Sequence, residues 1–288
     1  METTERPQGV VWVTGASSGI GWASALLLAR RGWCVAVSSR DVQKLERLAR
    51  RREDLHAYPL DVTDAVAREE VYDRIVRDLG PVDVLINNAG YGLRGVVEET
   101  PMHQVRDMFD VNVFAPLALT QLVLPSMRSR RHGRIINISS VVGRVAFPFG
   151  GIYAASKHAL EAWSDSLRME VKPWDIQVSL VEPGPIKTKF SSTAKELSQD
   201  RLMNEASPYA NYYRRFLSGG PVSGNTAWMP STVAWKVLKA VEDPYPKARY
   251  AVHWVAHLMP LLASLIPTPL FDRLMGGAFG LTEPAEGA

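Results

Sequence analysis

Short apolar runs alternate along the chain with longer stretches whose apolar positions recur at helical spacing. The runs predict strands near residues 9–13, 33–37, 56–62, 82–86, 134–139 and 177–182. The stretches between them predict helices near residues 20–31, 42–51, 64–79, 105–129 and 153–171. Several strand runs lack polar alternation, which is typical of strands covered on both faces. The repeated strand–helix order therefore predicts an α/β fold with a doubly wound parallel sheet.

The regular alternation ends after Pro183. The segment that follows carries prolines and glycines and a cluster of four aromatic residues, Tyr209, Tyr212, Tyr213 and Phe216. We expect about 188–230 to form a loop that covers an apolar substrate pocket. A helix at 231–241 and a strand at 248–252 bring the sheet to about seven strands. No linker-like change of composition interrupts the chain, so residues 1–288 are interpreted as a single domain.

An apolar tail occupies about residues 253–288. The segment 250–271 contains no Asp, Glu, Lys or Arg. Three prolines and two histidines interrupt it, namely Pro260, Pro267, Pro269, His253 and His257. Three interpretations remain open: a membrane-spanning helix, an interfacial helix lying on a membrane, and a structural tail that closes an apolar pocket. We expect the third, because the prolines disfavour a spanning helix.

The composition is that of an ordinary globular chain, with 46% apolar and 22% charged residues. The net charge of +3 is too small to suggest binding to nucleic acid. The single Cys34 excludes an intrachain disulfide, and the N-terminus has no apolar signal-peptide core. The histidines show no ligand spacing with carboxylates or Cys34, so no metal is expected. We therefore expect a cytoplasmic protein, with peripheral membrane contact through the tail as a possibility.

A glycine-rich turn joins the first predicted strand to the first helix. Thr14 is followed by G-x-x-x-G-x-G, with glycines at Gly15, Gly19 and Gly21. Glycines let the backbone approach a ligand closely, and the free amides of the next helix favour a pyrophosphate. A turn that serves only chain reversal is the alternative. The same stretch satisfies the hydrolase motif G-x-S-x-G, but only 14 residues precede Gly15, too few for the upstream strands of that fold.

The second predicted strand ends in Ser38-Ser39-Arg40. NAD-binding folds place an acidic residue about 20 positions beyond the glycines, on the ribose 2′-hydroxyl. Ser39 occupies that position here, and the guanidinium of Arg40 suits a 2′-phosphate. Asp41 is explained as the cap of the next helix. The pattern predicts NADP(H) rather than NAD(H), with a solvated surface arginine as the alternative.

Tyr153 and Lys157 stand four residues apart and so share one face of a predicted helix. An ammonium ~5 Å from a phenol, at an effective dielectric of ~20, would lower the phenol pKa by ~2 units. Such a tyrosine could give a proton to a carbonyl oxygen or take one from an alcohol. An isolated pair of this kind is usually just exposed. Here the glycine turn, the Asn-Asn-Ala-Gly run at 87–90, Ser139-Ser140 and this pair all follow strand ends, where open parallel sheets bind ligands.

In this order the motifs resemble those of the short-chain dehydrogenase/reductase family. The resemblance covers residues 8–190 and is completed by Asp61, Asn112 and the Pro183-Gly184 pair. It implies a Rossmann-type domain in which Tyr153 is the general acid/base. Lys157 would lower the phenol pKa and bind the nicotinamide ribose, and Ser140 would stabilise the substrate oxygen. Asn112 would hold a water that links Lys157 to solvent as a proton relay.

The resemblance also implies a set of cofactor contacts. They are Gly15, Ser17, Ser18, Gly19, Ile20, Gly21, Ser39, Arg40, Asp61, Val62, Asn88, Ala89, Gly90, Tyr153, Lys157, Pro183, Gly184, Ile186 and Thr188. Asp61 and Val62 would meet the adenine. Pro183, Gly184 and Ile186 would meet the nicotinamide, and Thr188 its carboxamide. Residues 247–250 and 270–275 resemble the hydroxysteroid and retinol dehydrogenase-like branch of the family.

These observations predict an NADP(H)-dependent short-chain dehydrogenase or carbonyl reductase. Its substrate is expected to be a bulky apolar ketone, aldehyde or alcohol of the steroid, retinoid, long-chain or aryl type. The alternative is a catalytically idle, nucleotide-sensing binding protein on the same fold. The long helices at 105–129 and 153–171 carry apolar side chains over much of their surface, and pairing across a twofold axis would bury the outer ones. We therefore expect a homo-oligomer, a dimer rather than a tetramer.

Overall fold

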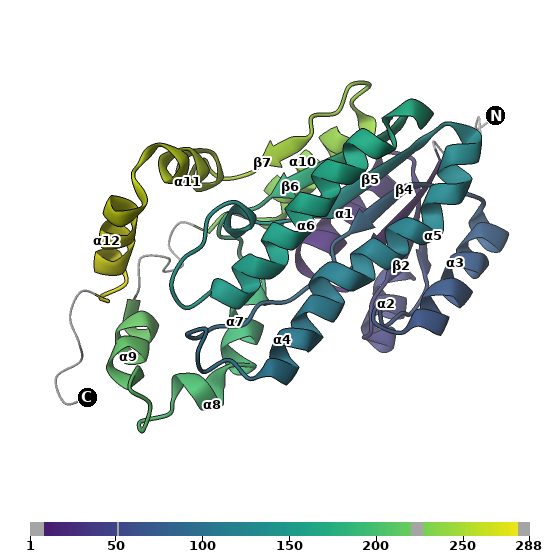
Figure 1. Cartoon of the computed structure of the whole chain (residues 1–288). Helices are drawn as coiled ribbons and strands as arrows, with labels where there is room; N and C mark the ends of the chain where they lie inside the picture. Colours follow the sequence, from purple (N-terminus) through teal and green to yellow (C-terminus); the bar gives the residue numbers. More distant parts are fainter. Residues whose placement is uncertain (1–8, 51, 220–226, 282–288) are drawn as a thin grey trace.

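Seven parallel strands form one sheet in the order β3-β2-β1-β4-β5-β6-β7 (Figure 1). The computed structural model describes residues 9–50, 52–219 and 227–281. The strands are β1 (Val10–Thr14), β2 (Cys34–Ser38), β3 (Leu55–Ala57), β4 (Val82–Asn87), β5 (Gly133–Ile138), β6 (Ile176–Glu182) and β7 (Arg249–Ala251). The chain winds outward from β1 in both directions, so right-handed crossovers place helices on both faces. The predicted single domain with a doubly wound parallel sheet is confirmed.

Helices cover the sheet on both sides. They are α1 (Gly19–Arg30), α2 (Val42–Ala49), α3 (Ala65–Leu79), α4 (Met102–Phe109), α5 (Ala115–Arg130), α6 (Gly151–Glu170) and α10 (Pro230–Glu242), with short turns η2 (Val141–Gly143) and η3 (Lys172–Trp174). One face carries α1 and α10, which pack against each other, together with α2. The opposite face carries α3, α5 and α6 (Figure 1).

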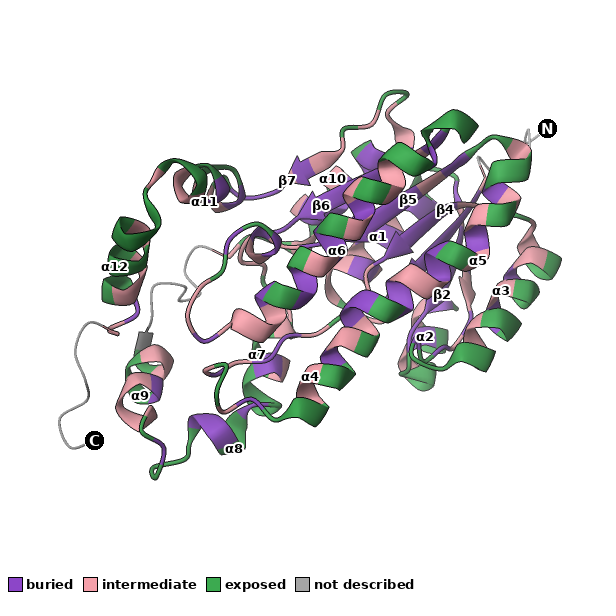
Figure 2. Cartoon of the chain, in the orientation of Figure 1, coloured by how far each residue is buried: buried purple, intermediate pink, exposed green. Residues whose placement is uncertain are grey.

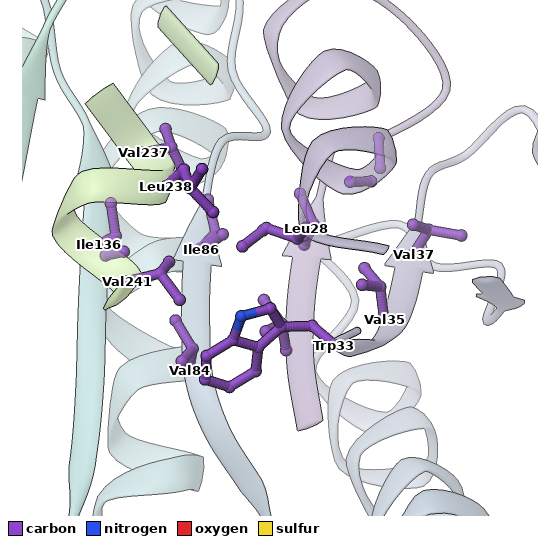
Figure 3. Close-up of a cluster of buried hydrophobic side chains, with 14 of the residues drawn as sticks. Leu28, Trp33, Val35, Val37, Val84, Ile86, Ile136, Val237, Leu238 and Val241 are labelled. Carbon is purple, nitrogen blue, oxygen red and sulfur yellow. The ribbon is translucent and has the colours of Figure 1, made fainter. Parts of the chain in front are cut away.

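Each face of the sheet has its own apolar core. In β1, Val11 and Val13 belong to the core beneath α1 and α10, whereas Val10 and Trp12 belong to the opposite core. Figure 3 shows the first of these cores, in which Leu28 and Val237 from the helices lie over the strands. Because both faces are covered, alternate residues of a strand are equally buried. This explains the unbroken apolar runs in the sequence.

Several predicted boundaries differ from the observed ones. The strand predicted at 56–62 is confined to β3, because beyond this edge strand only isolated bonds continue, such as that from Tyr58 N to Val37 O at 2.9 Å. The helix predicted at 105–129 begins at Met102 and is interrupted by a π-helical turn, η1 (Asp110–Phe114). The helix predicted from Tyr153 starts two residues earlier, so the tyrosine lies in its first turn. The last residue of the helix predicted at 42–51 lies outside the described residues.

The segment predicted as a covering loop is largely helical. Residues 188–230 contain α7 (Phe190–Glu196), α8 (Gln199–Leu202) and α9 (Ala210–Gly219), and residues 220–226 lie outside the described chain. The four aromatic residues of this segment form a satellite core with Phe147, Phe149 and Phe279, away from the sheet. Tyr213 is fully buried, and its hydroxyl donates to a carboxylate oxygen of Glu99 at 2.7 Å. Tyr213 is therefore an interior residue of the satellite core.

The C-terminal tail consists of two helices, α11 (Trp254–Leu265) and α12 (Thr268–Ala278). At about 1.5 Å per residue, neither is long enough to cross an apolar layer of about 30 Å. The inner side of α11 packs on η2 through Ala256, and Phe279 joins the satellite core. The outer side is apolar and exposed (green in Figure 2), and it includes Trp254, Leu258, Leu261, Leu265, Leu270 and Leu274. The tail thus folds against its own subunit and leaves an apolar outer face.

Within the described ranges, the segment Met102–Arg130 is long and apolar enough to cross a membrane by length and composition. Leu119 and Met127 of this segment are buried in the core beneath α5. Its apolar character is accounted for by its packing on the sheet.

Candidate functional site

The predicted site residues gather at the edge of the sheet where β1, β4, β5 and β6 end. Thr14 closes β1 and Asn87 closes β4. Ser140 follows β5, and Pro183 follows β6. Because the strands are parallel, their carboxyl ends meet at one edge, where ligands bind in open α/β sheets. The motifs that are scattered along the sequence are therefore brought together as predicted.

The turn after β1 is packed so closely that it excludes side chains. Gly15 has φ +63°, and a Cβ there would lie 2.8 Å from Cα of Ala89. A Cβ on Gly21 would lie 2.4 Å from Nδ2 of Asn88. Gly19 has φ +57° and begins α1, whose first turn holds no acidic residue. A backbone cradle at a helix N-terminus, without side chains in the way, fits the pyrophosphate of a dinucleotide. Ser17, Ser18 and Ile20 complete this turn.

Asn88 ties the end of β4 to this turn. Its Nδ2 donates to the carbonyl oxygens of Thr14 at 2.9 Å and Gly15 at 3.1 Å. In return, Oγ1 of Thr14 accepts from the amides of Asn88 and Ala89, both at 3.1 Å. A Cβ on Gly90 would lie 3.0 Å from Oδ1 of Asn112, so a side chain there would press on Asn112. The 87–90 motif thus fixes the shape of the cradle.

The side predicted to hold the adenosine lies at the ends of β2 and β3. Ser39 is buried and its Oγ accepts from the amide of Asp41, while Arg40 is exposed. The carboxylate of Asp41 accepts from the amide of Lys44 at 3.0 Å, which confirms Asp41 as a helix cap. Burial would raise the pKa of Asp61, but its hydrogen bonds from Thr63 and the charge of Arg40 bring the pKa below its ordinary value. Val62, the next residue in the chain after Asp61, is buried.

Ser140 and Tyr153 form the centre of the site. Oγ of Ser140 caps η2 and also donates to the carbonyl of Pro183 at 3.4 Å. Burial raises the pKa of the Tyr153 phenol to about 12, although a hydrogen bond with Ser140 and the charge of Arg94 act to lower it. The ring of Tyr153 contacts that of Phe190, with 5.4 Å between centroids. The phenol is therefore a proton-carrying group placed next to a hydroxyl.

Lys157 is buried one turn further along α6. Its ammonium donates to the carbonyl of Ile138 at 2.9 Å, and its Nζ lies 6.0 Å from the ring centroid of Tyr153. Burial lowers the pKa of Lys157 to about 8, while the charge of Glu161 raises it. The prediction that Lys157 lowers the phenol pKa is not met in this structure. Burial of the phenol has the larger effect, and the neighbouring cation that acts on it is Arg94.

Asn112 lies in the π-helical turn η1, a kind of distortion that often marks functional sites. Its Nδ2 donates to the carbonyl of Tyr91 at 2.9 Å and to Oγ of Ser156 at 3.1 Å. Its Oδ1 accepts from the amide of Tyr91 at 3.1 Å. The side chain therefore joins the loop after β4 to the helix that carries Tyr153 and Lys157.

The loop after β6 closes the predicted nicotinamide side. A Cβ on Gly184 would lie 2.6 Å from Cβ of His253, so this glycine allows the tail to approach. Ile186 forms a bridge with Trp228. Cγ2 of Thr188 would lie 3.2 Å from a Cβ on Gly19, which places the start of the segment 188–230 against the glycine turn. The loop after β6 and the glycine turn after β1 therefore lie against each other.

A charged cluster that the sequence analysis missed lies behind Lys157. Arg249 of β7 pairs with Glu161 at 3.0 Å, with Glu182 at 3.1 Å and with Asp165 at 2.5 Å. Burial and the charge of Glu161 raise the pKa of Glu182 to about 7. Glu161 follows Lys157 by four residues on α6, and this spacing was the one signal in the sequence. The cluster places negative charge next to the buried ammonium.

In the described parts of the chain, no group of three or more His, Cys, Asp or Glu residues could hold a metal ion. The chemistry available at this edge is that of a phenol, a hydroxyl, an ammonium and a phosphate cradle.

Comparisons with known proteins agree with this geometry. The family model for short chain dehydrogenases matches residues 9–199. The chain is 38% identical over 262 residues to a probable short-chain type dehydrogenase/reductase, VdlC, of Helicobacter pylori, covering 91% of this chain and 94% of that protein. It is 36% identical over 216 residues to a 3-ketodihydrosphingosine reductase of Bacteroides thetaiotaomicron, covering 74% of this chain and 75% of that protein.

Solved structures of the same fold contain both kinds of nicotinamide cofactor. An alcohol dehydrogenase from Thermococcus sibiricus in complex with 5-hydroxy-NADP superposes with TM-score 0.69, at 25% identity, covering 84% of this chain and 95% of that one. A short chain dehydrogenase/reductase from Burkholderia phymatum in complex with NAD gives TM-score 0.77 at 23% identity, covering 99% of each chain, and is similar in fold. A nicotinamide dinucleotide is thus the cofactor class that the fold and the cradle accept.

Proposed function

We propose that this chain, which belongs to the short-chain dehydrogenase/reductase family, uses NADP(H) to interconvert a bulky apolar ketone or aldehyde and its alcohol. The family and its hydroxysteroid/retinol dehydrogenase-like branch, both predicted from the sequence, are confirmed by these matches. The observation that carries the proposal is the meeting of Ser140, Tyr153 and Lys157 beside a glycine cradle that excludes side chains.

The preference for NADP(H) is supported by the end of β2. Ser39 leaves no carboxylate for the ribose 2′-hydroxyl, and Arg40 is an exposed cation at the next position. Asp41 is already engaged as the cap of α2 and so does not replace the missing acid. A 2′-phosphate would therefore meet a guanidinium and no competing carboxylate on β2.

The residues of this chain account for the proton side of the reaction. The dinucleotide, when bound, supplies the hydride for reduction or accepts it in the reverse direction. Tyr153 gives its phenolic proton to the substrate oxygen, because its raised pKa keeps it protonated at neutral pH. Ser140 donates a hydrogen bond to the same oxygen and stabilises the charge that develops on it. Asn112 holds the Tyr91 loop against α6, and Lys157 supplies the positive charge beneath the site.

The apolar substrate class is supported by the surfaces that surround Tyr153. Phe190 of α7 contacts its ring, and Leu93 is buried in the loop after β4. Beyond them lies the satellite core that Phe149 and Phe279 share with α9. The Bacteroides relative is named as a reductase of a ketone with a long chain, which agrees with an apolar site.

Loss of NADPH absorbance with a panel of carbonyl compounds tests the proposal. Steroid, retinoid, long-chain and aryl ketones should show higher kcat/KM than acetoacetyl esters or sugars, and NADPH should give higher values than NADH. The opposite ranking of substrates would refute the apolar site. Tight binding of NADPH without turnover of any carbonyl compound would instead favour the idle nucleotide-sensing protein.

For assembly and location, we propose a cytoplasmic homodimer in which α5 and α6 pair with their copies. The proposal is supported by Phe114, the last residue of η1 directly before α5, and by Met169 of α6, which are 56% and 67% exposed. The exposed outer face of α11 and α12 is the surface proposed for peripheral contact with a membrane. No aspartate, glutamate, lysine or arginine interrupts residues 250–271, which include all of α11.

A further inference from the structure

Arg94 lies in the loop after β4, and its main chain is fixed on both sides. Its amide donates to Oγ of Ser198 at 2.9 Å, and its carbonyl accepts from Nε and Nη2 of Arg201 at 3.1 and 2.9 Å. The amide of Gly95 donates to the carbonyl of Phe149 at 3.0 Å. Anchors from α8 and from the segment before α6 therefore hold this loop in place. All of these hydrogen bonds involve main-chain atoms of Arg94 and Gly95, and none uses the Arg94 guanidinium.

The guanidinium lies at the first turn of α6, beside the proposed acid/base. Its Nη1 is 3.5 Å from the point where a Cβ on Gly150 would stand, and Gly150 is the N-cap of α6. Tyr153 is three residues further on, and the charge of Arg94 acts on its phenol. Arg94 and Tyr153 are both partly accessible. The guanidinium and the phenol are thus electrostatic neighbours at the start of α6, and neither residue is fully buried.

No carboxylate pairs with Arg94 in the parts of the chain that the structure describes. Arg249, by contrast, has three carboxylate partners. The group that faces Arg94 is the Tyr153 phenol, and it carries no negative charge at neutral pH because its pKa is raised to about 12. A partly buried cation without a counter-charge is unfavourable, and a ligand that brings an anion removes this cost.

We propose that Arg94 binds a carboxylate of the substrate, which is then an apolar keto acid or the corresponding hydroxy acid. The inference rests on the proposed reaction at Tyr153, and it narrows the apolar substrate class to compounds with one acidic group. A guanidinium matches a carboxylate through two parallel hydrogen bonds, which lysine cannot reproduce. Phe190, next to Tyr153, would contact the apolar remainder of the substrate.

The test uses aryl and long-chain keto acids, each compared with its own methyl ester, with the carboxyl group one, two or three bonds from the ketone. The wild-type protein, Arg94→Gln and Arg94→Lys are assayed with NADPH. Arg128→Gln is the matched control, since Arg128 is an exposed arginine on α5 whose guanidinium lies over Trp174. The measured quantity is the ratio of kcat/KM for acid and ester.

The wild type should prefer the acid at one spacing at least, and Arg94→Gln should lower the acid-to-ester ratio roughly 10- to 150-fold, as expected for a lost charge-assisted pair. Arg94→Lys should recover part of the ratio, and Arg128→Gln should leave it unchanged. Two results would overturn the assignment. One is a wild-type preference for the ester at every spacing. The other is an equal loss with acid and ester in Arg94→Gln, with a shifted pH profile, which would mean that Arg94 acts only on the Tyr153 phenol.

Binding separates this inference from the proposed reaction. If no carbonyl compound is turned over, the proposed reaction is rejected. The shift in melting temperature produced by phenylpyruvate and by its methyl ester is then measured for the wild type and for Arg94→Gln. A shift with the acid alone, lost in Arg94→Gln, would still support the carboxylate site. Equal shifts in the two proteins, or none, would reject it.

Discussion

The cofactor edge of the sheet and the covering arm, which we define as α7, α8, α9, α11 and α12, are held together in different ways. At the edge, main-chain atoms meet at short range, as where Asn88 bonds to the carbonyls of Thr14 and Gly15. The arm is held by side chains from distant segments, as where Phe149, before α6, packs on Phe216 of α9 with 5.0 Å between ring centroids. Backbone geometry tolerates little variation, whereas packed side chains can be exchanged. We therefore propose that the edge determines the reaction, and that the arm, together with Arg94, determines the choice of substrate.

Removal of the Tyr153 hydroxyl is expected to have the largest effect. Tyr153→Phe should lower kcat at least ~100-fold, the low end for a lost general acid/base. The affinity for NADPH should stay within a few-fold, because the cradle is built from other residues. Steady-state kinetics and fluorescence titration with NADPH measure the two quantities.

Tyr72→Phe is the matched control for this variant, since Tyr72 of α3 stacks on Trp12 in the core beneath α3, with 6.4 Å between ring centroids. Its kcat should remain close to that of the wild type. If Tyr153→Phe turned over substrate at a similar rate, the edge would not carry the chemistry. The comparison between edge and arm would then be wrong.

Replacement of Arg40 is the next largest change. Arg40→Ala should reduce the preference for NADPH over NADH roughly 10- to 150-fold, since one charge-assisted pair with the 2′-phosphate is lost. The ratio of kcat/KM for the two cofactors, measured with one ketone, reports the effect. The ranking of substrates should not change, because it depends on the arm. An unchanged cofactor ratio, or a wild-type preference for NADH, would contradict the assignment, and Arg77→Ala on α3 serves as the control for loss of an exposed cation.

The smallest change concerns assembly. Light scattering should give about twice the chain mass of 31.9 kDa, and Phe114→Glu, at the end of η1 next to α5, should halve it. Leu265→Glu places the same charge on the arm, where Leu265 is 71% exposed, and should leave the mass unchanged. If Leu265→Glu separates the subunits instead, the arm and not the helix pair forms the interface.

Local motifs explain why the edge could be predicted from the sequence. Gly15 follows β1 and Asn88 follows β4, and these two strands are adjacent in the sheet. The periodicity of the strands and the spacing of the glycines were therefore sufficient to predict that the two residues meet. Arg94 could not be found in this way, because its role depends on Gly150 and on Tyr153, more than fifty residues away. The pKa of Tyr153 was predicted in the wrong direction, since a spacing of four residues reveals a nearby charge but not the degree of burial. The helices within residues 188–230 were not predicted, because α9 is stabilised by long-range packing of Tyr213 and Phe216 on Phe149.

The position of Phe279 also orders events during synthesis of the chain. Domains form from the N-terminus as the chain emerges. The strands of the sheet are complete once β7 has been made, and the cofactor edge can then assemble. Phe279 contacts Phe147 and Phe149 next to the start of α6, so the satellite core is complete only when almost the last described residues have been made. A nascent chain stalled before Phe279 would hold all seven described strands of the sheet and an incomplete satellite core.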